Sequence, residues 1–271
     1  MLRSSENMKP LAWLAAGALS LATAIPVTAV AEPGSDKWTY SAQIYFWMPE
    51  INVTTANGGD VDISFHDILQ DLKMTFMGNV AAYKGKWSLF ADGAYLNIYE
   101  DDSYTESVPI LGGRRDLEVD VDAGVNMKAF VGTLGATYNV FDNQKVTANL
   151  VGGARYLWID VDLNLDLSST GPLGRPLGRE INDNPSGDVW DGILGVNGKV
   201  NLNDKWYMPY YADVGTGQSD LTWQAQAGVG YKFKHADALL TYRYLHYEFD
   251  SGDALDDLTI KGPQVGAKFY F

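Results

Sequence analysis

The sequence predicts an all-β protein, a closed antiparallel transmembrane β-barrel of about ten strands, with about eight or twelve as alternatives. Three observations favour this fold. Apolar and polar residues alternate along long segments, the segments end in aromatic residues, and their connections are alternately short and long. These features occur together in membrane barrels, because one face of each strand meets lipid and the other faces the lumen.

The first segment reads as a secretory signal peptide, residues 1–31. Arg3 and Lys9 precede an apolar run at 11–25, and Ala29 and Ala31 supply the small residues of a cleavage site. That run is shorter than the roughly 20 apolar residues that span a bilayer. We therefore expect residues 32–271 to form an exported barrel domain.

The clearest strand is 221–233, where apolar residues from Leu221 to Phe233 alternate with polar residues or glycine. Its length exceeds that of usual globular strands and is sufficient to cross a bilayer. The same pattern predicts further strands at 37–49, 74–84, 87–99, 117–140, 146–167, 189–202, 206–214, 238–249 and 258–271. The connections at Gly85, 142–144, 203–205 and 235–237 are short, whereas those at 50–73, 100–116 and 166–187 are long. Short turns and both termini are therefore expected at the periplasmic end, with the long loops outside.

Aromatic residues gather near both ends of these strands. Near the short turns they are Trp38, Trp87, Phe141, Trp206 and Phe233, and near the other end they are Trp47, Trp158, Trp190 and Trp223. Aromatic rings favour the headgroup layer of a bilayer. The distribution predicts two aromatic girdles.

Two irregularities interrupt the strand pattern. The apolar positions change parity within 117–140 and 146–167, which predicts paired bulges near Ala129 and Ile159. Pro209 and Pro263 fall inside predicted strands, so we expect bulges or strand ends there.

The first long connection contains a helical pattern. Ser64 and Asp67 form a capping pair, and Phe65, Ile68, Leu69 and Leu72 share one helical face. We expect a short helix in the first external loop, docked at the barrel mouth as a lid. The alternative is a turn buried against the outer leaflet.

The composition limits the functions open to this chain. Its 271 residues include 34 Asp and Glu against 20 Lys and Arg, a formal net charge of −14. Nucleic-acid binding needs a basic surface, so no nucleic-acid partner is expected. The chain contains no cysteine, which removes disulfides and thiolate chemistry.

Charged residues of both signs lie on the polar faces of the predicted strands, and those faces line the lumen. They are Arg155, Asp191, Lys199, Asp213, Lys232, Arg243 and Lys268. A barrel of this size is narrow, so we expect these residues to form a hydrogen-bonded ion network that fills it. The alternative is a thin polar pore that selects solutes by charge.

Acidic residues alternate with apolar ones along two neighbouring strands, near their external ends. If Val140 pairs with Val146, Asp122 faces Asn164 and Asp120 faces Asp166. Opposed carboxylates destabilise a strand pair, and oxygen ligands suit calcium or magnesium. The favoured interpretation is a solvated, cation-screened rim. The alternative is a divalent-cation site at the external rim, bridging to lipopolysaccharide, from Glu118, Asp120, Asp122, Asp160, Asp162 and Asp166, and no other cofactor is expected.

An enzymatic alternative depends on His246. It shares a strand face with Glu248 and is followed by Ser251, the residue types of a lipid A-modifying or protease-like outer-membrane enzyme. The surrounding sequence lacks the motifs of those enzymes. We therefore assign no catalytic residue and favour a non-enzymatic protein.

The last strand carries a family resemblance. Val265, Ala267, Phe269 and the final Phe271 lie on one face, opposite Gln264, Gly266, Lys268 and Tyr270. This pattern resembles the C-terminal assembly signal of bacterial outer-membrane β-barrel proteins, which the barrel assembly machinery reads. Segments 187–192, 209–215 and 242–245 also resemble a group of small outer-membrane barrels without an assigned activity.

The resemblance implies a fold and a location in the outer membrane of a Gram-negative bacterium. The implied partners are outer-membrane lipid, lipopolysaccharide and the assembly machinery, with a monomer as the expected state. The expected function is that of a structural envelope protein, either filled or traversed by a narrow channel for small polar solutes.

Overall fold

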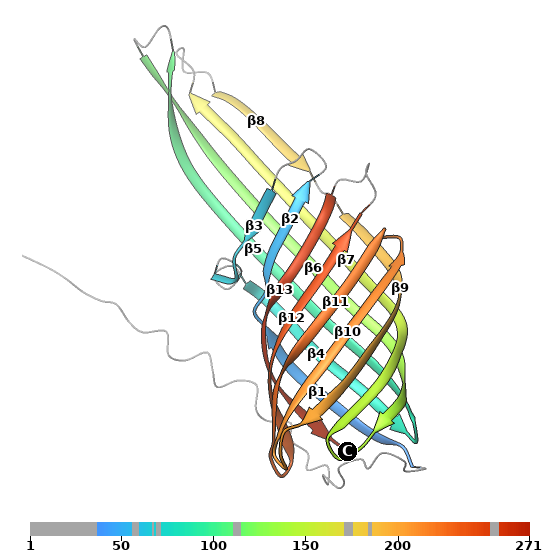
Figure 1. Cartoon of the computed structure of the whole chain (residues 1–271). Coiled ribbons are helices and arrows are strands. Elements are labelled where there is room, and N and C mark those ends of the chain that lie inside the picture. Colours follow the sequence, from blue (N-terminus) through green and yellow to red (C-terminus); the bar gives the residue numbers. More distant parts are fainter. Residues whose placement is uncertain are drawn as a thin grey trace, which may run out of the picture.

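The computed structural model describes residues 37–55, 60–66, 68, 72–110, 115–170, 176–183, 186–249 and 255–271. These residues form a closed antiparallel barrel (Figure 1). The strands are β1 (Thr39–Trp47), β2 (Glu50–Thr55), β3 (Asp60–Ile63), β4 (Leu72–Lys84), β5 (Trp87–Ile110), β6 (Arg115–Asp142), β7 (Val146–Thr170), β8 (Pro176–Asp183), β9 (Ser186–Asn201), β10 (Trp206–Gly217), β11 (Leu221–Lys232), β12 (Ala236–Glu248) and β13 (Leu255–Tyr270). The predicted signal peptide lies outside the described residues.

Strands β1 and β2 are successive parts of one barrel strand, because both pair with β13. The strand, but not the chain, is interrupted between β1 and β2. There the Met48 amide donates a hydrogen bond of 2.9 Å to the Pro263 carbonyl. Pro263 has no N–H to offer a neighbouring strand, and here it lies beside this interruption. With β1 and β2 counted once and with β3 and β8 as flanking strands, the barrel has the predicted ten strands.

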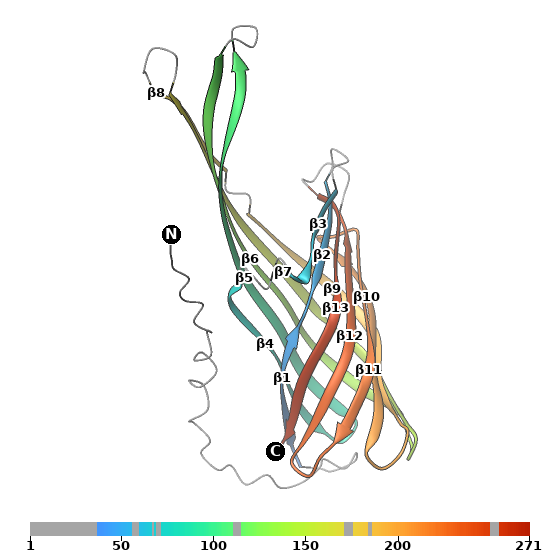
Figure 2. The ribbon, with the colours of Figure 1, turned by 90° about the vertical axis from the view of Figure 1, so that its left-hand side faces the viewer.

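The two ends of the barrel differ. Short turns lie at one end, which we call the turn end, and there Tyr40 and Phe271 exchange backbone hydrogen bonds of 3.0 and 2.8 Å. Gly85 makes the turn between β4 and β5 with a φ of 59°, a conformation that glycine adopts without steric cost. The opposite end, the loop end, carries the hairpin of β2 and β3 and the upper parts of β5, β6 and β7 (Figure 2).

The three segments expected as long loops contain strands, so that prediction was wrong. β2 and β3 lie within 50–73, and β8 lies within 166–187. Strands β5 and β6 pair without a register shift from Trp87 and Tyr138 up to Ile110 and Arg115. Figures 1 and 2 show these strands running with β7 and β8 well beyond the barrel. We call the part of β5 to β8 beyond the barrel the extended sheet.

The predicted bulges near Ala129 and Ile159 are also wrong. The two residues face each other in a continuous ladder, and the register of β6 and β7 shifts between Asn139 and Phe141, close to the turn. The apolar pattern changes parity because the surroundings change along the strands. Toward the turn end the outer face is apolar, as at Leu134, whereas toward the loop end Met127 and Ile159 point inward and pack on an internal cluster.

The outer surface carries a band of large apolar side chains. Leu194 is 71% exposed, and the band continues around the barrel through Ile44, Phe76, Val80, Leu89, Leu134, Leu150, Val196, Val214, Leu240 and Val265. At the turn end Trp38, Trp87, Phe141, Trp206 and Phe233 are exposed, as predicted for one girdle. Trp190 is exposed nearer the loop end. Trp47 was wrongly predicted to belong to the second girdle, because it is 1% exposed and lies inside the barrel.

The predicted helical turn is confirmed at Phe65, His66 and Ile68, where the Ile68 amide donates to the Ser64 carbonyl at 3.1 Å. Ile68 is buried in the internal cluster, and the Phe65 ring packs edge-on against Phe46 at 6.2 Å. Asp67 and Leu69 lie outside the described residues. In the part of the chain that the structure describes, no helix has the length and apolar character needed to cross a membrane.

Candidate functional site: the lumen

The side chains inside the barrel form successive layers along its axis. Strand β12 shows the order, because its alternate residues point inward from the turn end to the loop end: Asp237, Leu239, Thr241, Arg243, Leu245 and Tyr247. The first of these belong to a polar vestibule, Arg243 to a central layer, and the last two to an apolar cluster. We call the central group of Arg155, Asp213, Arg243, Asp92 and Gln224 the arginine layer.

Arg243 is held by several partners within this layer. Its Nη1 donates to Asp92 at 3.0 Å, and its Nε and Nη2 donate to Gln224 Oε1 at 3.0 and 2.7 Å. The Tyr45 hydroxyl donates to the same Asp92 carboxylate at 3.1 Å. A buried guanidinium requires such pairing, because an unpaired charge away from water is costly.

Arg155 is the second buried cation of the layer. It forms an ion pair with Asp213, and both side chains are fully buried. Its Nη1 also donates to Thr222 Oγ1 at 3.0 Å. Asp191, directly opposite Arg155 on β9, accepts a hydrogen bond of 2.9 Å from the Ser219 amide. Arg155 Nε and Asp213 Oδ1 make no hydrogen bond to described protein atoms, so the pair is joined through Arg155 Nη2 and Asp213 Oδ2 alone.

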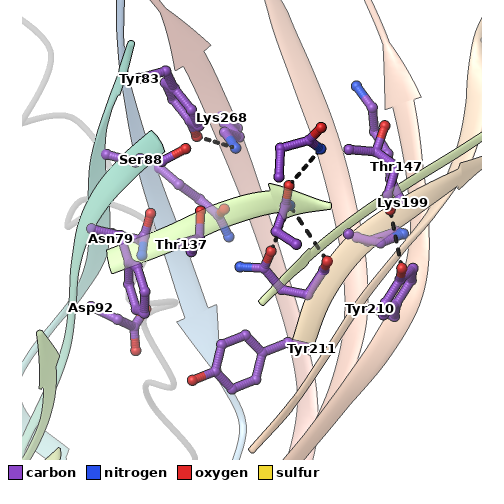
Figure 3. A pocket seen from close by; sticks show the side chains of 18 of the residues that line it. Asn79, Tyr83, Ser88, Asp92, Thr137, Thr147, Lys199, Tyr210, Tyr211 and Lys268 are labelled. Atoms are coloured by element: carbon purple, nitrogen blue, oxygen red, sulfur yellow. Dashed lines mark hydrogen bonds between the residues drawn. The ribbon is translucent and has the colours of Figure 1, made fainter. Parts of the chain in front are cut away.

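The vestibule is a cavity of about 380 Å³ between the turn end and the arginine layer, lined by polar and apolar side chains (Figure 3). Asn139, Asn149 and Asn197 form a ladder of side-chain hydrogen bonds of 2.8 Å across its wall. The Lys268 amine donates to the Tyr83 hydroxyl at 3.3 Å. Asp237 accepts hydrogen bonds of 2.8 Å from Tyr207 and Tyr270. The cavity therefore offers hydroxyl, amide and amine groups to a polar occupant.

The loop-end half of the lumen is filled by apolar side chains. We call this group the loop-end cluster, and its members are Tyr45, Trp47, Ile51, Ile68, Met77, Ala94, Leu96, Val131, Leu157, Leu245, Tyr247, Leu258 and Ile260. The Trp47 ring lies 4.8 Å from the Arg243 guanidinium, so the cluster rests directly on the arginine layer. Close-packed apolar side chains leave little room for water.

The seven residues predicted to form one lumen network all point inward, but they divide between two layers. Arg155, Asp191, Asp213 and Arg243 lie at the level of the arginine layer. Lys199 and Lys268 line the vestibule, and Lys232 lies near them and donates to Asn201 at 3.2 Å.

Sequence reasoning missed Asp92, Gln224 and Tyr45 as partners of Arg243. The alternation of 87–99 places Asp92 on the inner face with Ser88, so the sequence could have predicted that Asp92 lies in the lumen. Its pairing was not, because Asp92 and Arg243 are 151 residues apart in the chain.

The predicted rim site is described only in part. Asp160 and Asp162 share the outer face of β7, and the Lys128 amine lies 3.7 Å from each carboxylate. The Asn126 amide also donates to Asp162 at 3.2 Å. A lysine thus already supplies positive charge to these two acids.

The predicted register of the rim was wrong by two residues. Asp122 faces Asp166 and Asp120 faces Ser168, because Asn139 pairs with Asn149 before the shift near the turn. The side chains of Glu118, Asp120, Asp122 and Asp166 are not among the described ones. A calcium or magnesium site there stays a prediction.

His246 lies on the outer face of the barrel, because the neighbours Leu245 and Tyr247 point inward. Its Nδ1 is 2.8 Å from Thr259 Oγ1, and its Nε2 is 3.8 Å from Asp257 Oδ1. The ring also lies 5.9 Å from that of Trp223. Ser251, the proposed nucleophile of the enzymatic alternative, is outside the described residues.

The residues of the predicted assembly signal lie along the turn-end part of β13. Val265, Ala267 and Phe269 pair with Phe46, Ile44 and Ala42 of β1. Val265, Phe269 and Phe271 are exposed on the outer surface. Recognition by an assembly machinery stays a prediction.

No family model and no curated protein matches this sequence. Solved structures with a similar chain path include the translocator domain of the autotransporter NalP from Neisseria meningitidis, at 14% identity and a TM-score of 0.39, covering 86% of this chain and 88% of that one. Another is Ail, the attachment invasion locus protein of Yersinia pestis, at 14% identity and a TM-score of 0.32, covering 89% of this chain and 100% of that one. A third is the toluene transporter TodX of P. putida, at 14% identity and a TM-score of 0.33, covering 88% and 90%. The functional proposals therefore depend on the geometry of this chain.

Proposed function

We propose that this chain is a non-enzymatic structural barrel of a bacterial outer membrane, closed to solutes between its vestibule and its loop end. The observation that carries the proposal is the stacking of the loop-end cluster on the arginine layer. Both buried arginines have carboxylate partners, and the apolar side chains beyond them fill the lumen.

The outer surface supports the membrane location. Soluble proteins rarely expose large continuous apolar surfaces, whereas a membrane barrel must present such a band to lipid. Here the exposed apolar residues encircle the barrel, next to exposed aromatic residues at the turn end. In this location the turn end faces the periplasm, and the partners are outer-membrane lipid, lipopolysaccharide and the assembly machinery.

The pairing of the lumen charges argues against the alternative of a narrow channel. A selective pore needs charged groups that remain available to a passing solute, but Arg155 and Arg243 are both engaged by carboxylate partners. The vestibule is then a blind cavity that opens at the turn end. The enzymatic alternative places its histidine on the outer face, away from this cavity.

Planar-bilayer recording tests the proposal on protein shown to be folded by its heat-dependent gel mobility. The wild-type protein is expected to give no stable conductance steps. The double variant Trp47→Ala/Arg243→Ala removes the ring and the cation where the two layers meet, and is expected to give steps. Lys232→Ala, in the vestibule region, is the matched control and should stay silent. Ion-selective steps from the wild-type protein that change with Lys232→Ala would overturn the proposal.

A further inference from the structure

A histidine and two carboxylates meet on the outer face of the barrel, near its loop end. His246 and Glu248 belong to β12, and Asp257 belongs to the adjacent strand β13. One ligand-type atom from each residue lies within 4.8 Å of the other two. This cluster is separate from the predicted rim site, which involves β6 and β7.

The strand register creates the cluster. His246 and Glu248 are two residues apart, so both side chains leave the same face of β12. Glu248 pairs directly with Asp257, and His246 pairs with Thr259. Directly opposed like charges destabilise a strand pair, so the two carboxylates require a positive partner between them.

A lysine on this face, Lys261, is already engaged. Lys261 points to the same side of β13 as Asp257 and Thr259, and its amine lies 3.3 Å from Glu50 Oε1 on β2. The positive partner that the structure gives Asp257 is His246, which is charged only when protonated. A neutral imidazole leaves the two carboxylates uncompensated and offers a nitrogen lone pair to a metal.

The orientation of the imidazole fits metal binding. Histidine ligands usually donate the hydrogen of their second ring nitrogen to an oxygen, which fixes the tautomer and aims the first nitrogen at the metal. His246 Nδ1 lies 2.8 Å from Thr259 Oγ1, and this contact turns Nε2 toward Asp257 Oδ1, 3.8 Å away. Ligand atoms in a tetrahedral zinc site lie about 3.4 Å apart, because each is about 2.1 Å from the metal. The three atoms here lie within 4.8 Å of one another, so the carboxylates have to move closer to His246 Nε2 when the metal binds.

We propose that His246 Nε2, Glu248 and Asp257 bind one divalent transition-metal ion of the zinc class, with Thr259 as the positioning residue. An imidazole nitrogen favours zinc over calcium or magnesium, which prefer all-oxygen sites. Three protein ligands leave a fourth position of the metal open to water. The Trp223 and Tyr244 rings, stacked at 4.8 Å, lie beside His246, whose ring is 5.9 Å from that of Trp223. The proposal does not depend on whether the lumen conducts.

Zinc titration by calorimetry tests the site on untagged, folded, detergent-solubilised protein, because an affinity tag would itself bind the metal. The wild-type protein is expected to bind one Zn²⁺ per chain with saturable heat. The same protein with Co²⁺ should show the visible absorption of a nitrogen- and oxygen-ligated site. His246→Gln and Asp257→Asn should each remove both signals. Asp188→Asn, which changes an exposed acidic residue on β9 outside the cluster, should retain both.

The role of Thr259 has its own comparison. Thr259→Val removes the hydroxyl and is expected to weaken zinc binding about 10- to 100-fold, the usual effect of losing such a hydrogen bond. Thr259→Ser keeps the hydroxyl and should restore wild-type affinity. Because all these residues lie outside the lumen, heat-dependent gel mobility should confirm a folded barrel for each variant. Zinc binding that is absent in the wild type, unchanged in His246→Gln, or displaced by an equal concentration of Ca²⁺ would overturn the proposal.

Discussion

The guanidinium of Arg243 lies 4.8 Å from the centre of the Trp47 ring, and this contact joins the arginine layer to the loop-end cluster. The two residues come from β12 and β1, which lie on opposite sides of β13. A cation over an aromatic face is stabilised by the electrons of the ring, most strongly where water is excluded. The ring lies beside the guanidinium, while Asp92 and Gln224 accept hydrogen bonds from its N–H groups.

Replacing Asp92 with Ala should lower the free energy of unfolding by about 3 kcal/mol, because it leaves the buried Arg243 without its carboxylate. This figure is at the low end of the usual range, since the Asp92 side chain keeps 19% exposure and water can partly screen the pair. Urea unfolding followed by tryptophan fluorescence measures the change. Asp188→Asn, at an exposed residue, is the control and should change stability by less than about 0.5 kcal/mol.

The double variant Asp92→Leu/Arg243→Met separates charge pairing from general damage. It removes both charges and so leaves no buried cation unpaired, and it should therefore be more stable than Asp92→Ala alone. A double variant that is less stable than the single one would show that packing, and not the unpaired cation, determines the loss.

Gly198 allows a close approach of three strands, which predicts a second stability effect. The Tyr210 side chain crosses over Gly198 from β10, and its hydroxyl donates to the Thr147 carbonyl of β7 at 3.0 Å. A Cβ at Gly198 would overlap that carbonyl oxygen and lie 2.6 Å from the Tyr210 hydroxyl. Gly198→Ala should therefore lower the free energy of unfolding by about 1–3 kcal/mol.

Gly152 on β7 provides the matched control. A Cβ there would meet the Leu194 side chain at 3.6 Å, an ordinary contact. Gly152→Ala should unfold at the same urea concentration as the wild type. Equal losses in the two variants would mean that glycine flexibility, and not the space under Tyr210, determines the effect.

The outer apolar band predicts a third effect, which depends on lipid. Leu194→Arg places a charge at an outer position that is 71% exposed in the isolated chain and paired with Val214. In a bilayer this should cost about 2–4 kcal/mol, against about 0–1 kcal/mol for a charge near the interface. Leu202→Arg, in the turn after β9, is the interfacial control. Unfolding of both variants from lipid vesicles should show the difference, and equal costs would contradict the proposed membrane location.

The sequence alone predicted the barrel part of the strands well, because lipid on one side and the lumen on the other enforce alternation. Segments such as 206–214 and 221–233 therefore correspond closely to β10 and β11. The same rule failed beyond residue 99, where β5 continues outside the barrel and has no lipid-facing side to mark it.

The sequence predicted which charged residues face the lumen but not which residues they pair with. Parity placed Arg155 and Arg243 in the lumen, yet their partners depend on how strands distant in sequence close into a barrel. For Trp47 the prediction failed in a different way, because the position of the residue was wrong. As a tryptophan near a strand end it was assigned to a girdle, although its parity with Ser41 and Tyr45 places it inside. For the same reason the paired bulges were wrong, since a change of surroundings at Met127 produces the same sequence pattern as a register slip.

The extended sheet gives the last prediction, because its ladder continues that of the barrel without contributing to barrel closure. Closure depends on β1 and β13, whereas residues 103–122 pair only within β5, β6 and β7 in the described registers. Replacing 103–122 by an Asn-Gly turn joins Asp102 to Ala123, which already face each other. The shortened protein should reach the membrane fraction and keep the heat-dependent gel mobility of the wild type. A shortened chain that accumulates unfolded would instead show that the extended sheet is needed for assembly, since every lumen partner described here lies outside the deleted segment.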